Sequence, residues 1–238
     1  MRICSHPSPN FGERREGRAP ELIVIHYTAM ASAEAALTRL CAPEHEVSAH
    51  YLICERGGVF QLVAEEARAW HAGAGSWGGA GDVNSRSIGI ELANPGDAPF
   101  AARQMRALEA LLAEIMARHA IPPRGVIGHS DMAPGRKIDP GPRFDWRRLA
   151  LQGLSVWPRA AEGGAAVPDP ARFRAALIRF GYDPGTPPEI LLAAFRLRFN
   201  PAGRGALTAR ETAMAADLAA RWPFPAPSPA DRRQSPAR

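Results

Sequence analysis

Short apolar runs in the first half of the chain predict the strands of a sheet. Three of them, at residues 21–27, 87–92 and 125–128, consist mainly of small or β-branched apolar residues. They are shorter than a typical helix, so we expect each to be a buried strand. Two further runs, at 50–54 and 59–63, are joined through a pair of glycines and predict a β-hairpin.

Helical patterns lie between these runs. Apolar residues between positions 102 and 119 recur every three or four residues, and the pattern stops before Pro122-Pro123. A shorter helix is expected after Ser32, a suitable N-cap. Strands that alternate with helices indicate an α/β sheet. The polar residues 1–19 are expected to lie extended over the surface.

The composition changes after residue 150. Residues 151–169 are rich in Gly, Pro and Ala and are interpreted as a linker. Residues 170–222 contain three short helical patterns, each with an apolar face. We expect no cluster of buried polar groups among them. These two features suggest a binding or docking module. Residues 223–238 are rich in Pro, Arg and Ser and are expected to form a disordered tail. The first domain would then comprise residues 1–150.

Charge and cysteine content exclude few functions. The 238 residues carry a formal charge of +5, but the arginines are scattered, so nucleic acid is not the expected partner. Three cysteines without metal-type spacing do not suggest a disulfide framework. We find no apolar segment for export or for a membrane span, so we expect a soluble, cytoplasmic protein, unless translation starts upstream. Nothing in the sequence indicates an oligomeric state.

Four polar residues stand where catalytic or metal-binding groups would be useful. His26 and His129 lie at the ends of predicted strands, and Glu91 is a lone acid inside another. Asp139 follows in a loop fixed by prolines and glycines. Three of these side chains could bind one Zn²⁺ and leave a position open for water, with Glu91 as general base. Taken singly, each histidine is more often a structural residue with satisfied hydrogen bonds.

Lys137, two residues before Asp139, is the only lysine among 29 basic residues. It suggests a need for a compact ammonium where every other cation is a planar guanidinium. Such a group would stabilise the oxyanion formed during amide hydrolysis. Chance is the alternative explanation.

Several segments resemble a known family. They are VIHYT (24–28), VSAHYLI (47–53), WHAG (70–73), SIGIEL (87–92), GHSDMAPGRKIDPGP (128–142) and FDW (144–146). In this order they closely resemble the zinc-dependent N-acetylmuramoyl-L-alanine amidases of the AmpD/AmiD type. Residues 170–222 are similar, less specifically, to a three-helix peptidoglycan-binding domain, through GYD (181–183), AF (194–195) and RF (198–199).

The resemblance implies a mixed β-sheet flanked by helices and a function for each matched residue. His26, His129 and Asp139 correspond to the zinc ligands, Glu91 to the catalytic acid/base and Lys137 to the transition-state stabiliser. Substrate contacts are expected from the matching residues Tyr27, Trp70, His71 and Asn84, the last of which precedes the SIGIEL segment. The implied substrates are muropeptides, cut at the amide between N-acetylmuramic acid, or its 1,6-anhydro form, and L-alanine of the stem peptide.

Two alternatives stay open at this point. A cytoplasmic enzyme would recycle cell-wall fragments, whereas an exported one would remodel the wall itself. A non-catalytic peptidoglycan receptor on the same fold would bind without cutting, although such binders lose metal ligands that are all present here. We therefore expect a recycling amidase.

Overall fold

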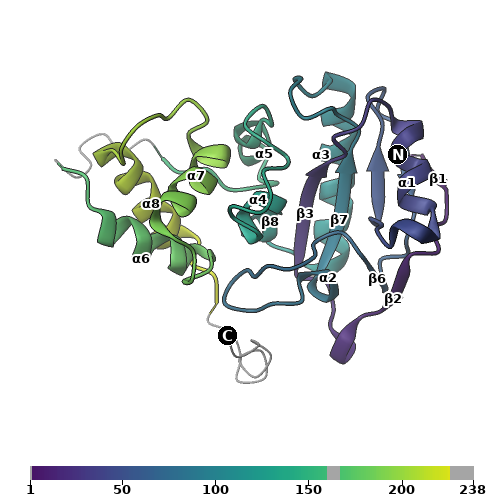
Figure 1. Cartoon of the computed structure of the whole chain (residues 1–238), viewed down its shortest axis with the longest axis horizontal. Helices are drawn as coiled ribbons and strands as arrows, with labels where there is room; N and C mark the ends of the chain where they lie inside the picture. The colour runs from purple at the N-terminus through teal and green to yellow at the C-terminus, as the bar shows by residue number, and fades with distance from the viewer. Residues whose placement is uncertain (1, 160–166, 226–238) are drawn as a thin grey trace.

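A six-stranded mixed sheet forms the centre of the protein in the computed structural model, which describes residues 2–159 and 167–225 (Figure 1). The strand order is β1-β5-β4-β7-β3-β8, and every neighbouring pair is parallel except β4 and β5. Its strands are β1 (Ile3–Ser5), β3 (Leu22–Tyr27), β4 (Tyr51–Ile53), β5 (Val59–Gln61), β7 (Ser87–Leu92) and β8 (Val126–Gly128). The predicted hairpin, β4 with β5, and the mixed sheet are confirmed.

The two faces of the sheet have different covers because side chains alternate along each strand. On one face, Ile23 and Ile25 of β3 pack with the apolar side of α3 (Ala102–His119). On the other face, Leu22 and Val24 pack into a cluster that extends to the C-terminal helices. Since His26 continues the series 22, 24, 26, its side chain leaves β3 on that second face.

Further elements surround this framework. The helix α1 (Ala33–Cys41) begins at Ser32, whose hydroxyl accepts a hydrogen bond from the Ala35 amide, as predicted. The remaining short elements are α2 (Val83–Arg86), α4 (His129–Met132), α5 (Trp146–Leu151) and 3-10 turns at Arg15–Gly17, Pro43–His45 and Pro123–Gly125. None of the helices in the described ranges is long and apolar enough to cross a bilayer.

Residues 2–19 are mostly exposed and partly extended, as expected, but they are also tied to the rest of the fold by two short strands and a buried arginine. β1 pairs with β5, and β2 (Phe11–Glu13) pairs antiparallel with β6 (Ala67–Ala69). The guanidinium of Arg14 is buried and donates hydrogen bonds to the carbonyls of Glu65 (2.7 Å) and Ser85 (2.9 Å). Three-residue strands are too short to show a period, so their pairing was not readable.

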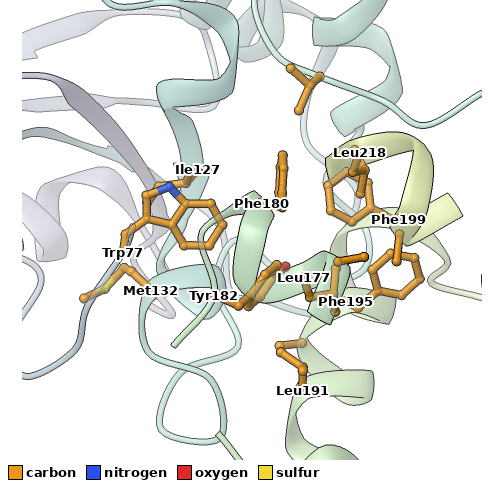
Figure 2. Close-up of a cluster of buried hydrophobic side chains, with 14 of the residues drawn as sticks. Trp77, Ile127, Met132, Leu177, Phe180, Tyr182, Leu191, Phe195, Phe199 and Leu218 are labelled. Carbon is orange, nitrogen blue, oxygen red and sulfur yellow. The ribbon is translucent and has the colours of Figure 1, made fainter. Parts of the chain in front are cut away.

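The three helices expected between residues 170 and 222 are present, as α6 (Pro170–Phe180), α7 (Pro188–Phe199) and α8 (Ala209–Arg221). They lie at one end of the molecule, beside α4 and β8 (Figure 1). Their apolar faces do not form a core of their own. Leu177, Phe180 and Leu218 share one buried cluster with Trp77, Ile127 and others from the first 150 residues (Figure 2).

The segments that flank these helices are packed as well. Ser155 and Val156, which fall in the expected linker, are buried, while residues 160–166 lie outside the described residues. The expected tail is packed as far as Phe224, whose amide donates to the Arg179 carbonyl (2.9 Å) and whose ring lies against Trp77. Residues 226–238 also lie outside the described residues.

The C-terminal helices carry buried charges, contrary to the expectation of none. Glu211 is fully buried and accepts hydrogen bonds from Arg196 at 2.6 and 3.0 Å. Arg198 is 1% exposed and pairs with Asp131 of α4 at 2.6 Å. Each charge is compensated by an opposite one, which is the condition for burying it.

Candidate metal centre and active site

The carboxyl ends of two central strands and the start of α4 bring the candidate residues together. His26 is the penultimate residue of β3, and Glu91 is its register partner on β7. β8 is paired with the opposite edge of β3 and ends at Gly128, so His129 emerges beside His26. In parallel sheets this edge is the usual place for a ligand site.

The loop that carries Asp139 is held against the start of α4. The Ser130 amide donates to the carbonyl of Asp139 at 2.9 Å. At Gly128, a Cβ atom would lie 2.9 Å from Cδ of Pro140, the residue after Asp139. A side chain at position 128 would therefore push the loop away and move Asp139 with it.

Three side-chain atoms converge at the centre of the site. Nδ1 of His26 lies 2.9 Å from Nδ1 of His129 and 2.9 Å from Oδ2 of Asp139, and the remaining separation, from His129 to Asp139, is 3.0 Å. All three residues are buried, and they are the His/Cys/Asp/Glu group with metal-binding geometry within the described ranges. Ligands of a tetrahedral zinc ion, at about 2.0–2.1 Å from it, lie roughly 3.3 Å apart, close to these separations.

A chain of hydrogen bonds sets the tautomer of His26. The hydroxyl of Ser87 donates to the carbonyl of Val83 (2.6 Å), so it accepts from Nε2 of His71 (3.2 Å). Nδ1 of His71 is then the acceptor for Nε2 of His26 at 3.0 Å. The proton of the neutral His26 ring therefore sits on Nε2, and Nδ1 presents a lone pair to the site.

His129 is oriented in the same way by one contact. Its Nε2 lies 2.9 Å from the carbonyl oxygen of Ala72, which can only accept, so Nε2 carries the proton and Nδ1 is again a free acceptor. Two imidazole lone pairs and one carboxylate oxygen thus face one another with no hydrogen between them. This arrangement is favourable only with a cation among the three, so these residues fit a divalent metal.

Electrostatics favour the metal-binding forms of His26 and Asp139. Burial, followed by the neighbouring His129, lowers the pKa of His26 to about 4, so the ring is neutral at pH 7. Burial alone would raise the pKa of Asp139, but the adjacent imidazoles of His129 and His26 outweigh it and hold that pKa well below its usual value. Neutral imidazoles and an ionised carboxylate are the forms that bind metal.

Glu91 stands beside this set without a fixed partner. Its Oε2 is buried and has no hydrogen-bond partner in the part of the chain that the structure describes. Burial, followed by the charge of Asp139, raises the pKa of Glu91 to about 8, while Lys137 opposes the rise. A carboxyl whose pKa lies near the working pH can both take and give a proton.

A cavity of about 560 Å³ opens onto these groups. His26, His129, Asp139, Glu91 and Lys137 all line it. Tyr27, Trp70 and His71 of the expected substrate contacts line it too. Both ring nitrogens of His71 are already engaged, with His26 and Ser87, so the ring bridges these two residues.

Asn84 is placed differently from these residues. It does not line the cavity, and its buried side-chain oxygen accepts hydrogen bonds from the amides of His71 (3.1 Å) and Ala72 (2.8 Å). These contacts give Asn84 a structural role, and its contact with substrate stays a prediction. Asn84 fixes the backbone whose Ala72 carbonyl in turn orients His129.

Two residues that matter for the site were missed in the sequence, although β7 carried a signal for them. Ser87, Gly89 and Glu91 alternate with Ile88, Ile90 and Leu92, so the polar or small residues share the face of the site. A Cβ atom at Gly89 would come within 2.5 Å of the His71 ring, so glycine leaves room for that ring. Ser87 ends the hydrogen-bond chain from His26.

A mixed α/β sheet that brings two histidines and an aspartate into metal-binding geometry beside a half-buried glutamate is typical of metal-dependent hydrolases. The chain belongs to the N-acetylmuramoyl-L-alanine amidase family, whose model matches residues 16–142. This confirms the family expected from the sequence motifs, and with it an amidase.

Individual relatives agree with this placement. The chain is 39% identical over 223 residues to the N-acetylmuramoyl-L-alanine amidase AmiD of Escherichia coli. This alignment covers 79% of each protein. It is 35% identical over 160 residues to the 1,6-anhydro-N-acetylmuramyl-L-alanine amidase AmpD of Enterobacter cloacae, which covers 60% of this chain and 86% of that protein. The structure of AmiD from E. coli in complex with anhydro-N-acetylmuramic acid-L-Ala-D-gamma-Glu-L-Lys superimposes with a TM-score of 0.79 at 34% identity, covering 91% of this chain and 99% of AmiD.

Proposed function

We propose that this protein is a zinc-dependent amidase that cuts between the lactyl group of N-acetylmuramic acid, or of its 1,6-anhydro form, and L-alanine of the stem peptide. The observation that carries the proposal is the convergence of three proton-free acceptors, from His26, His129 and Asp139, beside the partnerless carboxyl of Glu91. Support also comes from the AmiD relative, whose structure contains an anhydromuramoyl peptide.

His26, His129 and Asp139 would hold the ion. When bound, zinc supplies a Lewis acid that polarises a carbonyl oxygen and lowers the pKa of water towards 7. The Nε2 contacts of both histidines, to His71 and Ala72, keep the two rings aimed at the ion.

Glu91 moves the proton. Its carboxylate accepts a proton from the attacking water and delivers it to the nitrogen of the leaving alanine, without which the C–N bond does not break. Lys137 lines the same cavity as His26 and Glu91, which supports a role at the reacting carbonyl. From there its ammonium stabilises the negative charge that develops on the carbonyl oxygen.

The walls of the cavity suit a substrate with a sugar at one end and a peptide at the other. Tyr27 and Trp70 offer aromatic surface for the sugar ring. Arg39 lines the cavity from α1 and Arg136 from the loop before Asp139, which favours a substrate with peptide carboxylates.

The test is a comparison of kcat/KM on muramoyl-L-alanyl peptides that differ only in a 1,6-anhydro or a reducing muramic end. We expect zinc-loaded protein to release free stem peptide and chelated protein to release none. A preference for the anhydro form would support a role in the recycling of wall fragments. We propose that the protein carries out this recycling in the cytoplasm. Fractionation of cells that express the untagged native gene tests that location, and recovery outside the cytoplasm contradicts it.

A further inference from the structure

The four-residue helix α4 carries His129 and is bonded to the C-terminal helices through one buried carboxylate. Oδ2 of Asp131 accepts from Arg198 of α7 at 2.6 Å and from the Gly128 amide at 2.8 Å. Its Oδ1 accepts from the Tyr182 hydroxyl at 2.6 Å. Asp131 is 0% exposed, and Arg198 and Tyr182 are each 1% exposed. Charge-assisted hydrogen bonds in such a dry setting are strong and directional.

Arg198 also reaches the chain on both sides of α4. Its Nη2 donates to the carbonyl of Val126 in β8 (3.0 Å) and to the hydroxyl of Ser155 (3.2 Å). Its guanidinium lies 4.2 Å from the ring centroid of Trp146. One side chain of the C-terminal helices thus ties together the strand before α4, α4 itself and the segment that follows α5.

The position of α4 decides the position of the metal-binding groups. A helix of four residues has no stability of its own, so its contacts fix it. His129 is its first residue, the Ser130 amide holds the backbone of Asp139, and the carbonyl of Ala133 accepts from the Lys137 amide (3.0 Å). Any shift of α4 moves His129 and Asp139 relative to His26.

The same helices also brace the loop behind His129. Trp77 lies against Phe180 and Tyr182, with ring centroids 5.6 and 5.0 Å away (Figure 2). The Gly78 amide donates to the carbonyl of Gly181 at 2.8 Å. This loop begins near Ala72, whose carbonyl orients His129.

We propose that the C-terminal helices α6–α8 are a structural part of the metal centre, with Arg198 and Tyr182 as positioning residues that hold His129 through Asp131. The inference rests on the proposed function in that His129 is a metal ligand. It assigns these helices a role inside the catalytic unit, besides any binding of peptidoglycan.

Three full-length variants test this inference. Arg198→Met removes the charge that Asp131 faces, and Tyr182→Phe removes only one hydroxyl and keeps the ring against Trp77. Arg196→Met is the matched control, because Arg196 lies on the same helix and pairs with buried Glu211, and its hydrogen bonds go to α8 and to the loop before it. Zinc affinity is measured by competition with a chromogenic chelator, and amide hydrogen exchange of residues 128–133 is measured on metal-free protein.

We expect Arg198→Met to weaken zinc binding about 10–100-fold and Tyr182→Phe about tenfold, as for residues that orient metal ligands elsewhere. Exchange at residues 128–133 should accelerate in both. Arg196→Met should bind zinc within about twofold of wild type, with faster exchange confined to α7 and α8. Unchanged zinc affinity and unchanged exchange in Arg198→Met and Tyr182→Phe would overturn the inference.

Failure of the proposed function has a different signature. Wild-type protein would then bind no zinc. The exchange measurement needs no metal, so it would still show whether Arg198 and Tyr182 hold α4 in place. If the amides of residues 128–133 are protected from exchange in wild type and lose that protection in Tyr182→Phe, the positioning role is supported. If they keep it in both Tyr182→Phe and Arg198→Met, the positioning role is refuted.

Discussion

His26 and Glu91 are register partners on the neighbouring parallel strands β3 and β7. Register partners in a parallel pair point to the same face, so the proposed metal ligand and the proposed proton carrier stand side by side on rigid backbone. A shift of one residue in either strand would bury one of the two side chains under α3. The pairing of the two central strands therefore assembles half of the site.

The role of Glu91 is tested by Glu91→Gln, which keeps the shape of the side chain but cannot accept a proton. We predict that kcat falls about 10²–10⁴-fold, the usual contribution of a positioned acid/base, while zinc affinity stays that of wild type. Steady-state kinetics with a metal titration on the same preparations measure both. A kcat within tenfold of wild type would show that another group moves the proton.

Lys137 is predicted to act on the transition state rather than on substrate binding. Lys137→Met should lower kcat about 10²–10³-fold with little change in KM, because the lost charge faces an oxyanion that forms only during reaction. Lys137→Arg should restore only part of the rate, since a planar guanidinium does not replace a compact ammonium. A rise in KM with unchanged kcat would instead assign Lys137 to the binding of substrate.

The hydrogen-bond chain from His26 through His71 to Ser87 predicts a difference between two substitutions at position 71. His71→Leu can neither accept from His26 nor donate to Ser87, so zinc affinity should fall about 10–100-fold. His71→Gln has both an acceptor and a donor and should bind zinc more tightly than His71→Leu. Chelator competition gives the order, and equal affinities in the two variants would contradict the orienting role.

Glu65 predicts how stability depends on acid pH. Burial alone would raise the pKa of this carboxyl, but hydrogen bonds from Arg118, Tyr51 and His119 outweigh it and lower the pKa to about 2. Because the pKa is lower in the folded state, the stabilisation is complete above the unfolded value of about 4.5 and is lost as the pH falls towards 2. A shift of this size corresponds to about 3 kcal/mol of unfolding free energy.

The measurement is urea unfolding of wild type and Glu65→Gln between pH 6 and pH 2.5. The wild type should lose its advantage over the variant across the acid half of this range. Parallel curves for the two proteins would show that Glu65 does not titrate with unfolding.

The central strands and their polar ends were predictable because apolar runs stop at them. β3 ends with His26, β8 ends just before His129, and Glu91 interrupts an apolar strand, so the shared edge followed from the parallel order. The Pro/Gly-rich loop of Asp139 was equally visible. These features depend on local residue type, which a single sequence displays.

Side-chain directions in the segment between β6 and β7 were not predictable. No period relates Trp70, His71 and Asn84 to a face, so the inward-turned amide of Asn84 and the bridging ring of His71 required coordinates. Arg198 did leave a signal. It follows Leu191 and Phe195 at positions i, i+4 and i+7 on the buried side of α7, where a cation needs a buried partner. That partner, Asp131, is 67 residues away in sequence.

Hydrolysis in ¹⁸O-labelled water tests the central claim most directly. Zinc-loaded protein is incubated with an anhydromuramoyl-L-alanyl peptide, and the masses of both products are measured by mass spectrometry. We predict one ¹⁸O atom in the carboxylate of the muramic acid product, none in the released peptide, and no products from chelated protein. Label in a peptide fragment, cleavage in the sugar, or an intact substrate with zinc-loaded protein would contradict the account.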